Sequence, residues 1–520
     1  MTVRTLTKRS FYQDSVALMG VARELRGGAG IQEAAALMGT PANRELMEQA
    51  GLLTAEAAAA GPNDLVIVVR AQSDAAASTA LARAESLLTE RRRRVEAAGR
   101  RLPRTLDRAR RQLDGANLAL ISVPGPFAAA EARKALIRGL HVMLFSDNVA
   151  LEDEIALKRL AMERGLLLMG PDCGTAYLNG VPLGFANAIP RGRIGLVAAS
   201  GTGLQQVVCL LAVGGEGVSQ AIGVGGRDMS DAVGAAMTLA ALDALGGDPG
   251  TELVIVVGKP PAPAVRGRVE SRLRALGKPA VVAMLGRDVT PRRDGPLHTV
   301  ASLEDAAGAA LALLSRREYR SRSFGDLEDA ARGIAERRHA LAAGQTAVRG
   351  LFAGGTLAYE ALLILEPLLG PVGGNLSHGV ASAHRVVDLG EDELTRGRAH
   401  PMLDATLRAD EIARAGKEAD VAVLLVDVVL GHGAAADPAG DIAPALEAAQ
   451  AHARAHGRGR AVVASVVGTS ADPQGLDRQV ARLESAGAWV LSSNAQAARA
   501  AAAIAGGARV TETLFAGGMR

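Results

Sequence analysis

Hydrophobic residues form short apolar runs that recur along most of the chain, and each run is followed by a stretch with helical spacing. Such runs occupy 64–70, 118–123, 192–199, 253–257 and 421–426. Because polar residues do not alternate with apolar ones in these runs, they predict buried parallel strands covered by helices on both faces. The pattern therefore predicts an α/β protein with several parallel sheets in tandem.

Breaks in this rhythm divide the chain, which at 520 residues is too long for a single hydrophobic core. The expected segments are a small N-terminal α/β module with a basic helix (1–112), a first sheet domain (113–191), a second sheet domain (192–316), a helical connector (317–346) and a third sheet domain (347–520).

Local signals place several elements of the N-terminal module. Thr40 followed by Pro41 predicts the start of a helix, with Thr40 as its N-cap. An Ala-rich helix is expected after the strand at 64–70 and runs toward Arg94. The basic stretch 91–111 is interpreted as a solvated helix face, with an anion-binding arm as the alternative.

Composition argues against several classes of function. A net charge of +3, spread along the chain, and an aromatic content of 2% give no basis for nucleic-acid binding. No apolar run approaches the roughly 20 residues that span a bilayer, and no leader pattern precedes Phe11. The two cysteines, Cys173 and Cys209, suit a reducing compartment. We therefore expect a cytoplasmic protein that binds neither nucleic acid nor membrane.

Two glycine-rich loops each join an apolar strand to the start of a helix. A helix N-terminus offers free backbone N–H groups and a positive dipole end, which together suit an anion. The predicted phosphate-binding residues are Ser200, Gly201, Thr202 and Gly203 in one loop, and Gly354, Gly355 and Thr356 in the other. The alternative for the first loop is a tight turn in which Ser200 serves only as the N-cap.

A third loop of small residues also ends a predicted strand, where ligands of α/β proteins gather. Gly225 and Gly226 are predicted to line a ligand there, and Arg227 either neutralises a carboxylate or phosphate or pairs with Asp231. Cys173, in an earlier loop, has no base near it in the sequence, so it is expected to be a buried or ligand-lining thiol rather than a nucleophile.

The irregular stretch 373–404 is dense in His, Arg and Asp. Its histidines lack the regular spacing of a zinc site, so no metal is expected. An Arg side chain can grip a carboxylate with two hydrogen bonds, and the candidate substrate-binding residues are Arg396, Arg398 and His400. The alternative is a structural Arg–Asp network that includes Asp388 and Asp404.

Three motifs resemble the CoA-binding and ligase domains of succinyl-CoA synthetase α subunits. They are GPDCGT at 170–175, GRIGLVAASGTG at 192–203 and GVGGRDMSD at 223–231, and the resemblance covers about 115–315. The third sheet domain is similar to the C-terminal part of the synthetase β subunit. The resemblance implies Rossmann-like and flavodoxin-like parallel-sheet domains in tandem.

Motifs along nearly the whole chain resemble the FdrA family. They are FYQDSVALM at 11–19, MGTPAN at 38–43, FSDNVALEDEI at 145–155, GGTLAYE at 354–360 and GRAHPMLD at 397–404. This resemblance implies a subunit of oxamate carbamoyltransferase, which converts oxalurate and phosphate to oxamate and carbamoyl phosphate in allantoin breakdown. It also implies small anionic substrates, including carbamoyl phosphate, and other protein subunits as partners.

One departure separates the chain from the synthetases, in which a His in a Gly-His-Ala-Gly loop carries phosphate. Here the predicted strand 280–285 leads to Leu297-His298-Thr299-Val300, and that motif is missing. The alternatives are an acyl-CoA synthetase that uses ATP and binds CoA near Pro124 and Asn148, and a scaffold or regulatory protein without activity. The sequence assigns no catalytic residue.

Overall fold

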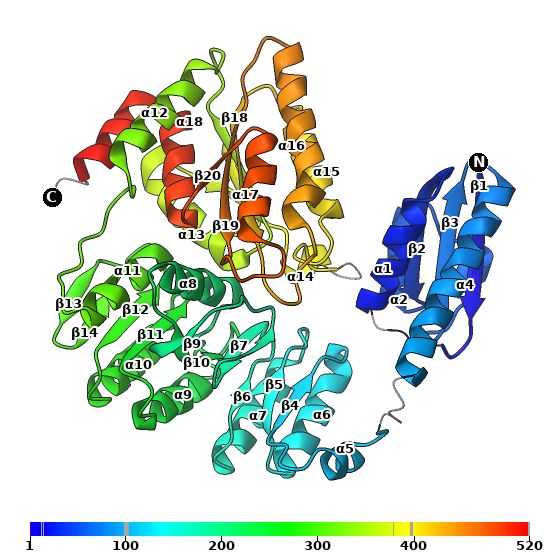
Figure 1. Cartoon of the computed structure of the whole chain (residues 1–520), viewed down its shortest axis with the longest axis horizontal. Coiled ribbons are helices and arrows are strands. Elements are labelled where there is room, and N and C mark those ends of the chain that lie inside the picture. Colours follow the sequence, from blue (N-terminus) through cyan, green and yellow to red (C-terminus); the bar gives the residue numbers. More distant parts are fainter. Residues whose placement is uncertain (12, 14, 98–102, 378, 396–398, 518–520) are drawn as a thin grey trace. The chain divides into compact units, whose positions relative to one another are not determined.

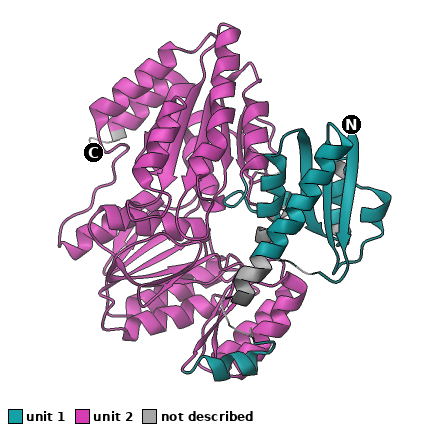
Figure 2. Cartoon of the chain, turned by 45° about the vertical axis from the view of Figure 1, so that its right-hand side comes forward, with its two compact units in different colours: residues 1–114, 392–404 teal, residues 115–391, 405–520 magenta. Residues whose placement is uncertain are grey.

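The computed structural model describes residues 1–11, 13, 15–97, 103–377, 379–395 and 399–517. These described residues form four sheets, and the chain divides into two compact units. Unit 1 comprises 1–114 and 392–404, and unit 2 comprises 115–391 and 405–520 (Figure 2).

Unit 1 is built on a three-stranded antiparallel sheet in the order β1-β3-β2. Its elements are β1 (Thr2–Lys8), α1 (Ser15–Arg26), β2 (Ile31–Met38), α2 (Pro41–Gln49), α3 (Ala55–Ala58), β3 (Leu65–Ala71), α4 (Asp74–Ala97) and α5 (Leu106–Gln112), with α14 (Asp392–Thr395) in its second segment. Thr40 caps α2 as predicted, because its side chain accepts a hydrogen bond from the Asn43 amide. The strand β2 was not predicted.

The first sheet of unit 2 is small and parallel, in the order β4-β5-β6. Its strands and the helices that connect them are β4 (Leu118–Ile121), α6 (Gly125–Ile137), β5 (His141–Leu144), α7 (Leu151–Glu163) and β6 (Leu168–Met169). The apolar runs of the sequence supply its strands, and β5 is buried along most of its length. This is the Rossmann-like part of the expected architecture.

The second sheet has eight strands in the order β13-β14-β12-β11-β9-β10-β7-β8. Its elements are β7 (Thr175–Leu178), β8 (Val181–Gly184), β9 (Arg191–Ala198), α8 (Gly201–Val213), β10 (Val218–Gly223), α9 (Ala236–Gly247), β11 (Leu253–Gly258), α10 (Pro263–Ala275), β12 (Ala280–Met284), β13 (Arg292–Asp294), β14 (Leu297–Thr299) and α11 (Leu303–Leu314). The hairpin β7–β8 pairs with β10, so 175–184 belongs to this sheet rather than to the preceding domain, where the sequence boundary at 191 had put it.

The third sheet has six parallel strands in the order β16-β17-β15-β18-β19-β20. Its elements are α12 (Leu327–His339), β15 (Ala347–Phe352), α13 (Gly355–Leu369), β16 (Val372–Gly373), β17 (His384–Asp388), α15 (Thr406–Ala415), β18 (Val421–Val429), α16 (Pro438–Ala455), β19 (Ala461–Val467), α17 (Leu476–Ser485), β20 (Ala488–Leu491) and α18 (Asn494–Gly517).

Helices cover both faces of the larger sheets, as the continuous apolar strands require. In the third sheet α12, α13 and α18 lie on one face, and α15, α16 and α17 lie on the other (Figure 1). In the second sheet α8 packs beside α11, and α9 packs beside α10. Since α8 also contacts α13, helices of the two larger sheets meet inside unit 2. The chain is therefore an α/β protein with several parallel-strand sheets.

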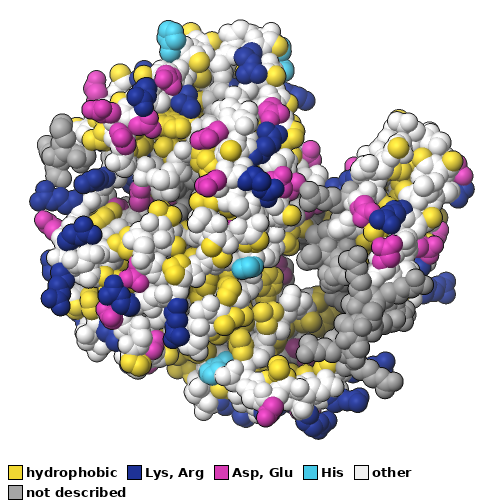
Figure 3. Space-filling model, viewed as in Figure 1, with side chains coloured by type: hydrophobic (Ala, Val, Ile, Leu, Met, Phe, Trp, Pro, Cys, Tyr) yellow, Lys and Arg dark blue, Asp and Glu magenta, His cyan; other side chains and the backbone are white. Residues whose placement is uncertain are grey.

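The surface of unit 2 carries charges of both signs. Basic and acidic side chains are interspersed over the face seen in Figure 3. Within the described ranges, no helix combines the length and the hydropathy needed to cross a bilayer.

Candidate functional site

The two predicted phosphate loops face each other. One loop leads from β9 into α8, and the other leads from β15 into α13. Ser200 Oγ in the first loop lies 2.6 Å from Thr356 Oγ1 in the second, although 156 residues separate them in sequence. The N-termini of α8 and α13 therefore converge on one place, which we call the α8–α13 site.

The start of α8 is shaped by this close approach. Ser200 is the N-cap, and its Oγ accepts a hydrogen bond from the Gly203 amide at 2.9 Å. A Cβ atom on Gly203 would lie 2.6 Å from Ser200 Oγ and 3.1 Å from Thr356 Cγ2, so only glycine fits. At Gly201 the nearest atom to such a Cβ is 3.5 Å away, which leaves room for one. Ser200 is thus both the N-cap and a residue of the shared site.

The start of α13 is held from behind by a buried carboxylate. Asp427 on β18 accepts hydrogen bonds from the amides of Ala353 and Gly354, both at 2.8 Å. Arg408, also buried, pairs with Asp427 at 2.9 Å. A Cβ on Gly354 would lie 3.0 Å from Thr202 Oγ1, so this glycine also permits the approach of the other loop.

Backbone donors remain available on both helices. Among the described residues, no hydrogen-bond partner is found for the amides of Gly201 and Thr202 on α8. The same holds for the amides of Gly355, Thr356 and Leu357 in the first turn of α13. Donors of this kind at a helix N-terminus suit an anion, and here two such ends lie together.

Two charged residues that were not predicted to bind ligand stand at the α8–α13 site. Lys259 directly follows β11, and its Nζ lies 5.9 Å from the centroid of the Tyr359 ring on α13. Asp388 ends β17, and its Oδ2 lies 2.3 Å from where a Cβ on Gly355 would be. Burial raises the pKa of Asp388 to about 6, although the Gly390 amide and the charge of Lys259 lower it in part.

Arg227 is engaged by a partner that the sequence did not indicate. Its Nε lies 2.8 Å from Glu154 Oε2, and its guanidinium donates to the carbonyl of Val149, so the pairing with Asp231 is not observed. Lys158, which is buried, links Glu154 at 2.7 Å to Asp228 at 2.8 Å. The Arg227 side chain keeps 46% of its surface exposed, and carboxylate binding by it stays a prediction.

The structure also describes the surroundings of the three predicted ligand-lining residues Gly225, Gly226 and Cys173. Gly225 has a φ of +84°, and a Cβ there would lie 2.2 Å from the carbonyl oxygen of Pro171. Gly226 is exposed, and a Cβ there would meet no atom within 4 Å. Cys173 is buried, and burial raises its pKa to about 12. Its thiol is therefore protonated at neutral pH, in keeping with a buried thiol rather than a nucleophile.

The predicted cluster near the end of the irregular stretch is only partly within the structure. Arg396 and Arg398 lie outside the described residues. His400 is described and belongs to unit 1, whereas Asp388 belongs to unit 2. His400 Nδ1 accepts a hydrogen bond from the Met402 amide at 3.2 Å. Within the described ranges, no group of three or more His, Cys, Asp or Glu side chains is arranged to hold a metal ion.

The segment that follows β12 is tied to α13. Arg287 makes two hydrogen bonds with Glu366, at 2.7 and 2.8 Å. His298 lies in the middle of β14, paired with Val281 and Arg293, and partial burial lowers its pKa. In the sheet order β12 and β11 separate β14 from β9, so His298 sits in a strand away from the α8–α13 site.

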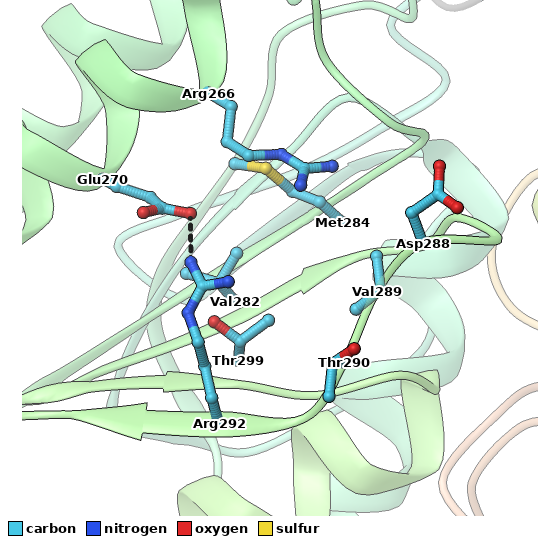
Figure 4. Close-up of a pocket in the computed structure, with 9 residues that line it drawn as sticks. All are labelled: Arg266, Glu270, Val282, Met284, Asp288, Val289, Thr290, Arg292 and Thr299. Atoms are coloured by element: carbon cyan, nitrogen blue, oxygen red, sulfur yellow. Dashed lines mark hydrogen bonds and ion pairs between the residues drawn. The ribbon is translucent and has the colours of Figure 1, made fainter. Parts of the chain in front are cut away.

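A depression beside β12 is separate from this arrangement (Figure 4). Its lining residues are Arg266, Glu270, Val282, Met284, Asp288, Val289, Thr290, Arg292 and Thr299. Arg292 donates to Glu270 at 3.0 Å across it. It contains none of the residues that the sequence predicted to bind a ligand.

Two family models match parts of the chain. The first, AllF, heavy metal-associated domain, matches 1–103, and the second, CoA-ligase, matches 351–504. The uncharacterized protein YahF of Escherichia coli (strain K12) is 39% identical over 503 residues, which cover 95% of this chain and 97% of YahF.

Other similarities are more distant. Subunit alpha 2 of an ADP-forming succinate–CoA ligase from Archaeoglobus fulgidus is 28% identical over 207 residues, which cover 38% of this chain and 67% of the subunit. Among solved structures, the dinucleotide-forming acetyl-coenzyme A synthetase 1 of Ca. Korarchaeum cryptofilum is similar with a TM-score of 0.27 and 17% identity, over 78% of this chain and 85% of that one. The likeness to YahF alone among these three extends over nearly the whole sequence.

Proposed function

The chain belongs to the FdrA family and to the wider CoA-ligase superfamily, and we propose that it is a carbamoyl-transferring subunit that binds phosphate at the α8–α13 site. The reaction would be that of oxamate carbamoyltransferase, in which oxalurate and phosphate give oxamate and carbamoyl phosphate. The observation that carries the proposal is the 2.6 Å approach of Ser200 Oγ to Thr356 Oγ1, because it brings two helix N-termini together.

Electrostatics favour an anion between these helices. Each N-terminus carries about half a positive charge, and an anion near one is typically stabilised by about 0.3–1 kcal/mol. The positive ends of α8 and α13 repel each other, and a negative group between them offsets this repulsion. Lys259 adds a full positive charge at the same edge of the second sheet. A phosphate dianion, with several acceptor oxygens, fits these donors.

The proposed chemistry uses the same groups at each step. A phosphate oxygen attacks the ureido carbonyl of oxalurate, and the amides of the two first turns stabilise the negative charge of the tetrahedral intermediate. The bond between the carbonyl carbon and the nitrogen then breaks, and oxamate leaves. Its carboxylate would be held by Arg227, while carboxylate binding by Arg396, Arg398 and His400 stays a prediction from the sequence.

The proposal also includes the partners and the product of the reaction. The family resemblance supports further protein subunits as partners and carbamoyl phosphate as the product. Neither CoA nor ATP takes part in the reaction as proposed, and both would be needed only for a synthetase.

One observation favours that second candidate, an ATP-dependent acyl-CoA synthetase. The loop at Pro124 and the loop at Asn148, where CoA would bind in a synthetase, are in contact: a Cβ on Gly125 would lie 2.4 Å from the carbonyl oxygen of Asn148. A synthetase of this type should acquire acid-labile phosphate on a histidine after incubation with ATP. Mass spectrometry that finds none would count against this candidate.

The decisive experiment tests phosphate at the α8–α13 site. The purified chain, with its partner subunits, is given oxalurate and phosphate, and carbamoyl phosphate is measured. Gly201→Val should abolish the phosphate-dependent formation of carbamoyl phosphate with the fold retained. A Cβ at this position has room in the structure, and the new side chain would crowd an anion bound at the free amides. Gly267→Val on α10, where a Cβ would meet nothing within 4 Å, is the control for a glycine-to-valine change that the fold tolerates.

An unchanged KM for phosphate in Gly201→Val would refute the assignment of this loop. Succinyl-CoA formed from succinate, CoA and ATP, with no carbamoyl phosphate from oxalurate, would favour the synthetase. Binding of ligand without turnover in any mixture of subunits would favour the scaffold.

A further inference from the structure

A buried carboxylate points at the α8–α13 site with one oxygen unused. Asp388 is 7% exposed, and its Oδ1 accepts a hydrogen bond from the Gly390 amide at 2.9 Å. Its Oδ2 has no hydrogen-bond partner in the part of the chain that the structure describes. That oxygen lies 2.3 Å from where a Cβ on Gly355 would be, beside the free amides of the first turn of α13.

The backbone around Asp388 is fixed, so this direction is built into the fold. The Asp388 amide donates to Asn375 Oδ1 at 3.0 Å, and Asn375 Nδ2 donates to the Asp388 carbonyl at 2.7 Å. Asp388 also pairs with Phe352 in the parallel ladder between β17 and β15. Because Gly355 follows Phe352 by only three residues, the carboxylate and the helix start are held together.

We propose that Asp388 is the catalytic acid of the transfer, protonated when phosphate is bound, and that it delivers its proton to the leaving nitrogen. This inference rests on the proposed function. An ionised carboxylate would repel a phosphate at the amides of Gly355 and Thr356. A neutral carboxylic acid would instead donate a hydrogen bond to the substrate, so the anion favours the protonated form.

The proton balance of the reaction closes without another reactant. The bond from a phosphate oxygen to the carbonyl carbon forms, and the bond from that carbon to the nitrogen breaks. The nitrogen takes the electron pair and the proton of Asp388, so oxamate leaves as a neutral amide rather than as an amide anion. Hydrogen phosphate enters with one proton, and this proton returns Asp388 to its starting form.

The charges that face Asp388 agree with a group that titrates near neutrality. Burial raises its pKa to about 6, and the charges of Glu391 and Asp427 act in the same direction. Lys259 and the Gly390 amide lower the pKa. A bound dianion is a further nearby negative charge, so it raises the pKa again and makes binding take up a proton.

Proton uptake is best measured with sulfate, a dianion that has no proton to lose near neutral pH. Calorimetric titration at pH 7 in buffers of different ionisation enthalpy should give about 0.5–1 proton taken up per sulfate bound to the wild-type protein, given a free pKa of about 6. Asp388→Asn should bind sulfate at least as tightly with uptake near zero. Asp410→Asn, an exposed Asp on α15, is the control and should behave as the wild type.

Turnover of the complete enzyme provides the second readout. Asp388→Asn should form carbamoyl phosphate roughly 10²–10⁴-fold more slowly, with little change in the KM for phosphate, because the amide cannot supply a proton. The wild-type kcat should fall tenfold per pH unit above the pKa of the bound acid, a test that needs no variant. If Asp388 served only to maintain the fold, Asp388→Asn would take up as many protons on sulfate binding as the wild type. The wild-type kcat would then not fall with rising pH in this way.

The outcomes separate this inference from the proposed function. A wild-type protein that binds neither sulfate nor phosphate and forms no carbamoyl phosphate would overturn both. Anion binding with the same proton uptake in wild type and Asp388→Asn, or normal turnover by that variant, would overturn the role of Asp388 alone. A kcat that stays constant up to pH 9 would do the same.

Discussion

Glu360 offers a test of how α13 is anchored, through the dependence of stability on pH. It lies on α13, one turn after Thr356, and is 1% exposed. Its Oε1 accepts a hydrogen bond from the Leu303 amide at 2.7 Å, at the start of α11, and its Oε2 accepts one from Asn494 Nδ2 at 2.8 Å. Burial raises the pKa of Glu360 to about 7, although these two hydrogen bonds lower it in part.

The sign and the size of the effect follow from linkage. With a folded pKa of about 7 against an ordinary value of 4.5, the folded protein holds the proton of Glu360 more tightly than the unfolded chain. The resulting stabilisation is fully present below the unfolded pKa and is lost as the pH rises through 7. Between pH 5.5 and 7.5 the free energy of unfolding should therefore fall by about 2 kcal/mol, since each unit of pKa difference corresponds to about 1.36 kcal/mol.

The assay is thermal unfolding of the whole chain at pH 5.5, 6.5 and 7.5, for the wild type, Glu360→Gln and the exposed control Glu328→Gln. Gln cannot ionise, so the Tm of Glu360→Gln relative to the wild type should rise by a few degrees from pH 5.5 to 7.5. The Glu360→Gln protein can be less stable than the wild type at every pH, because its NH₂ group faces a hydrogen-bond donor. The expected change with pH is the same in that case, since only the wild-type side chain titrates. Wild-type and Glu360→Gln curves that stay parallel over this range would refute the reasoning, and Glu328→Gln should show such parallel behaviour.

Two further predictions concern buried groups away from the α8–α13 site. Lys158→Met should lower the free energy of unfolding by about 3–5 kcal/mol, because it leaves the buried carboxylates of Glu154 and Asp228 without their shared cation. The control Lys134→Met removes the cation of an exposed ion pair and should change the free energy of unfolding little. Denaturant unfolding followed by circular dichroism compares them, and equal midpoints would contradict the argument. Cys173 and Cys209 should not react with a thiol reagent at pH 7.5 until the chain unfolds, since both are buried and burial raises the pKa of each; reaction in the native protein would show that the thiols are accessible.

The sequence predicted the fold best where burial leaves a continuous apolar run. The stretches at 64–70, 253–257 and 421–426 correspond to β3, β11 and β18. The strand β2 was missed because its sequence, IQEAAALM, is rich in Ala and pairs along an edge with alternating burial. The β7–β8 hairpin was missed as well, since strands of four residues owe their pairing with β10 to tertiary contacts rather than to local preference.

The candidate site was predictable in parts but not as a whole. Small residues between a strand and a helix identified both phosphate loops, because that pattern has a local physical cause. No local signal could show that Ser200 and Thr356 meet across 156 residues. Lys259 and Asp388 are single charged residues at strand ends, and their importance depends on the order of strands in the second and third sheets. Parallel sheets bring the carboxyl ends of distant strands together, so such residues emerge only from the topology.

The helix α13 explains why the two loops form one site. Thr356, Glu360 and Glu366 lie along it, and each contacts a different part of the second sheet domain: Ser200 before α8, Leu303 at the start of α11, and Arg287 after β12. Three contacts spread along one helix fix its direction as well as its position. The free amides of α8 and α13 are thus held ready before any anion arrives, and preorganised donors of this kind are the ones that stabilise a transition state most effectively. It follows that neither sheet domain contains the site alone, and that a change anywhere along α13 should be felt at its N-terminus.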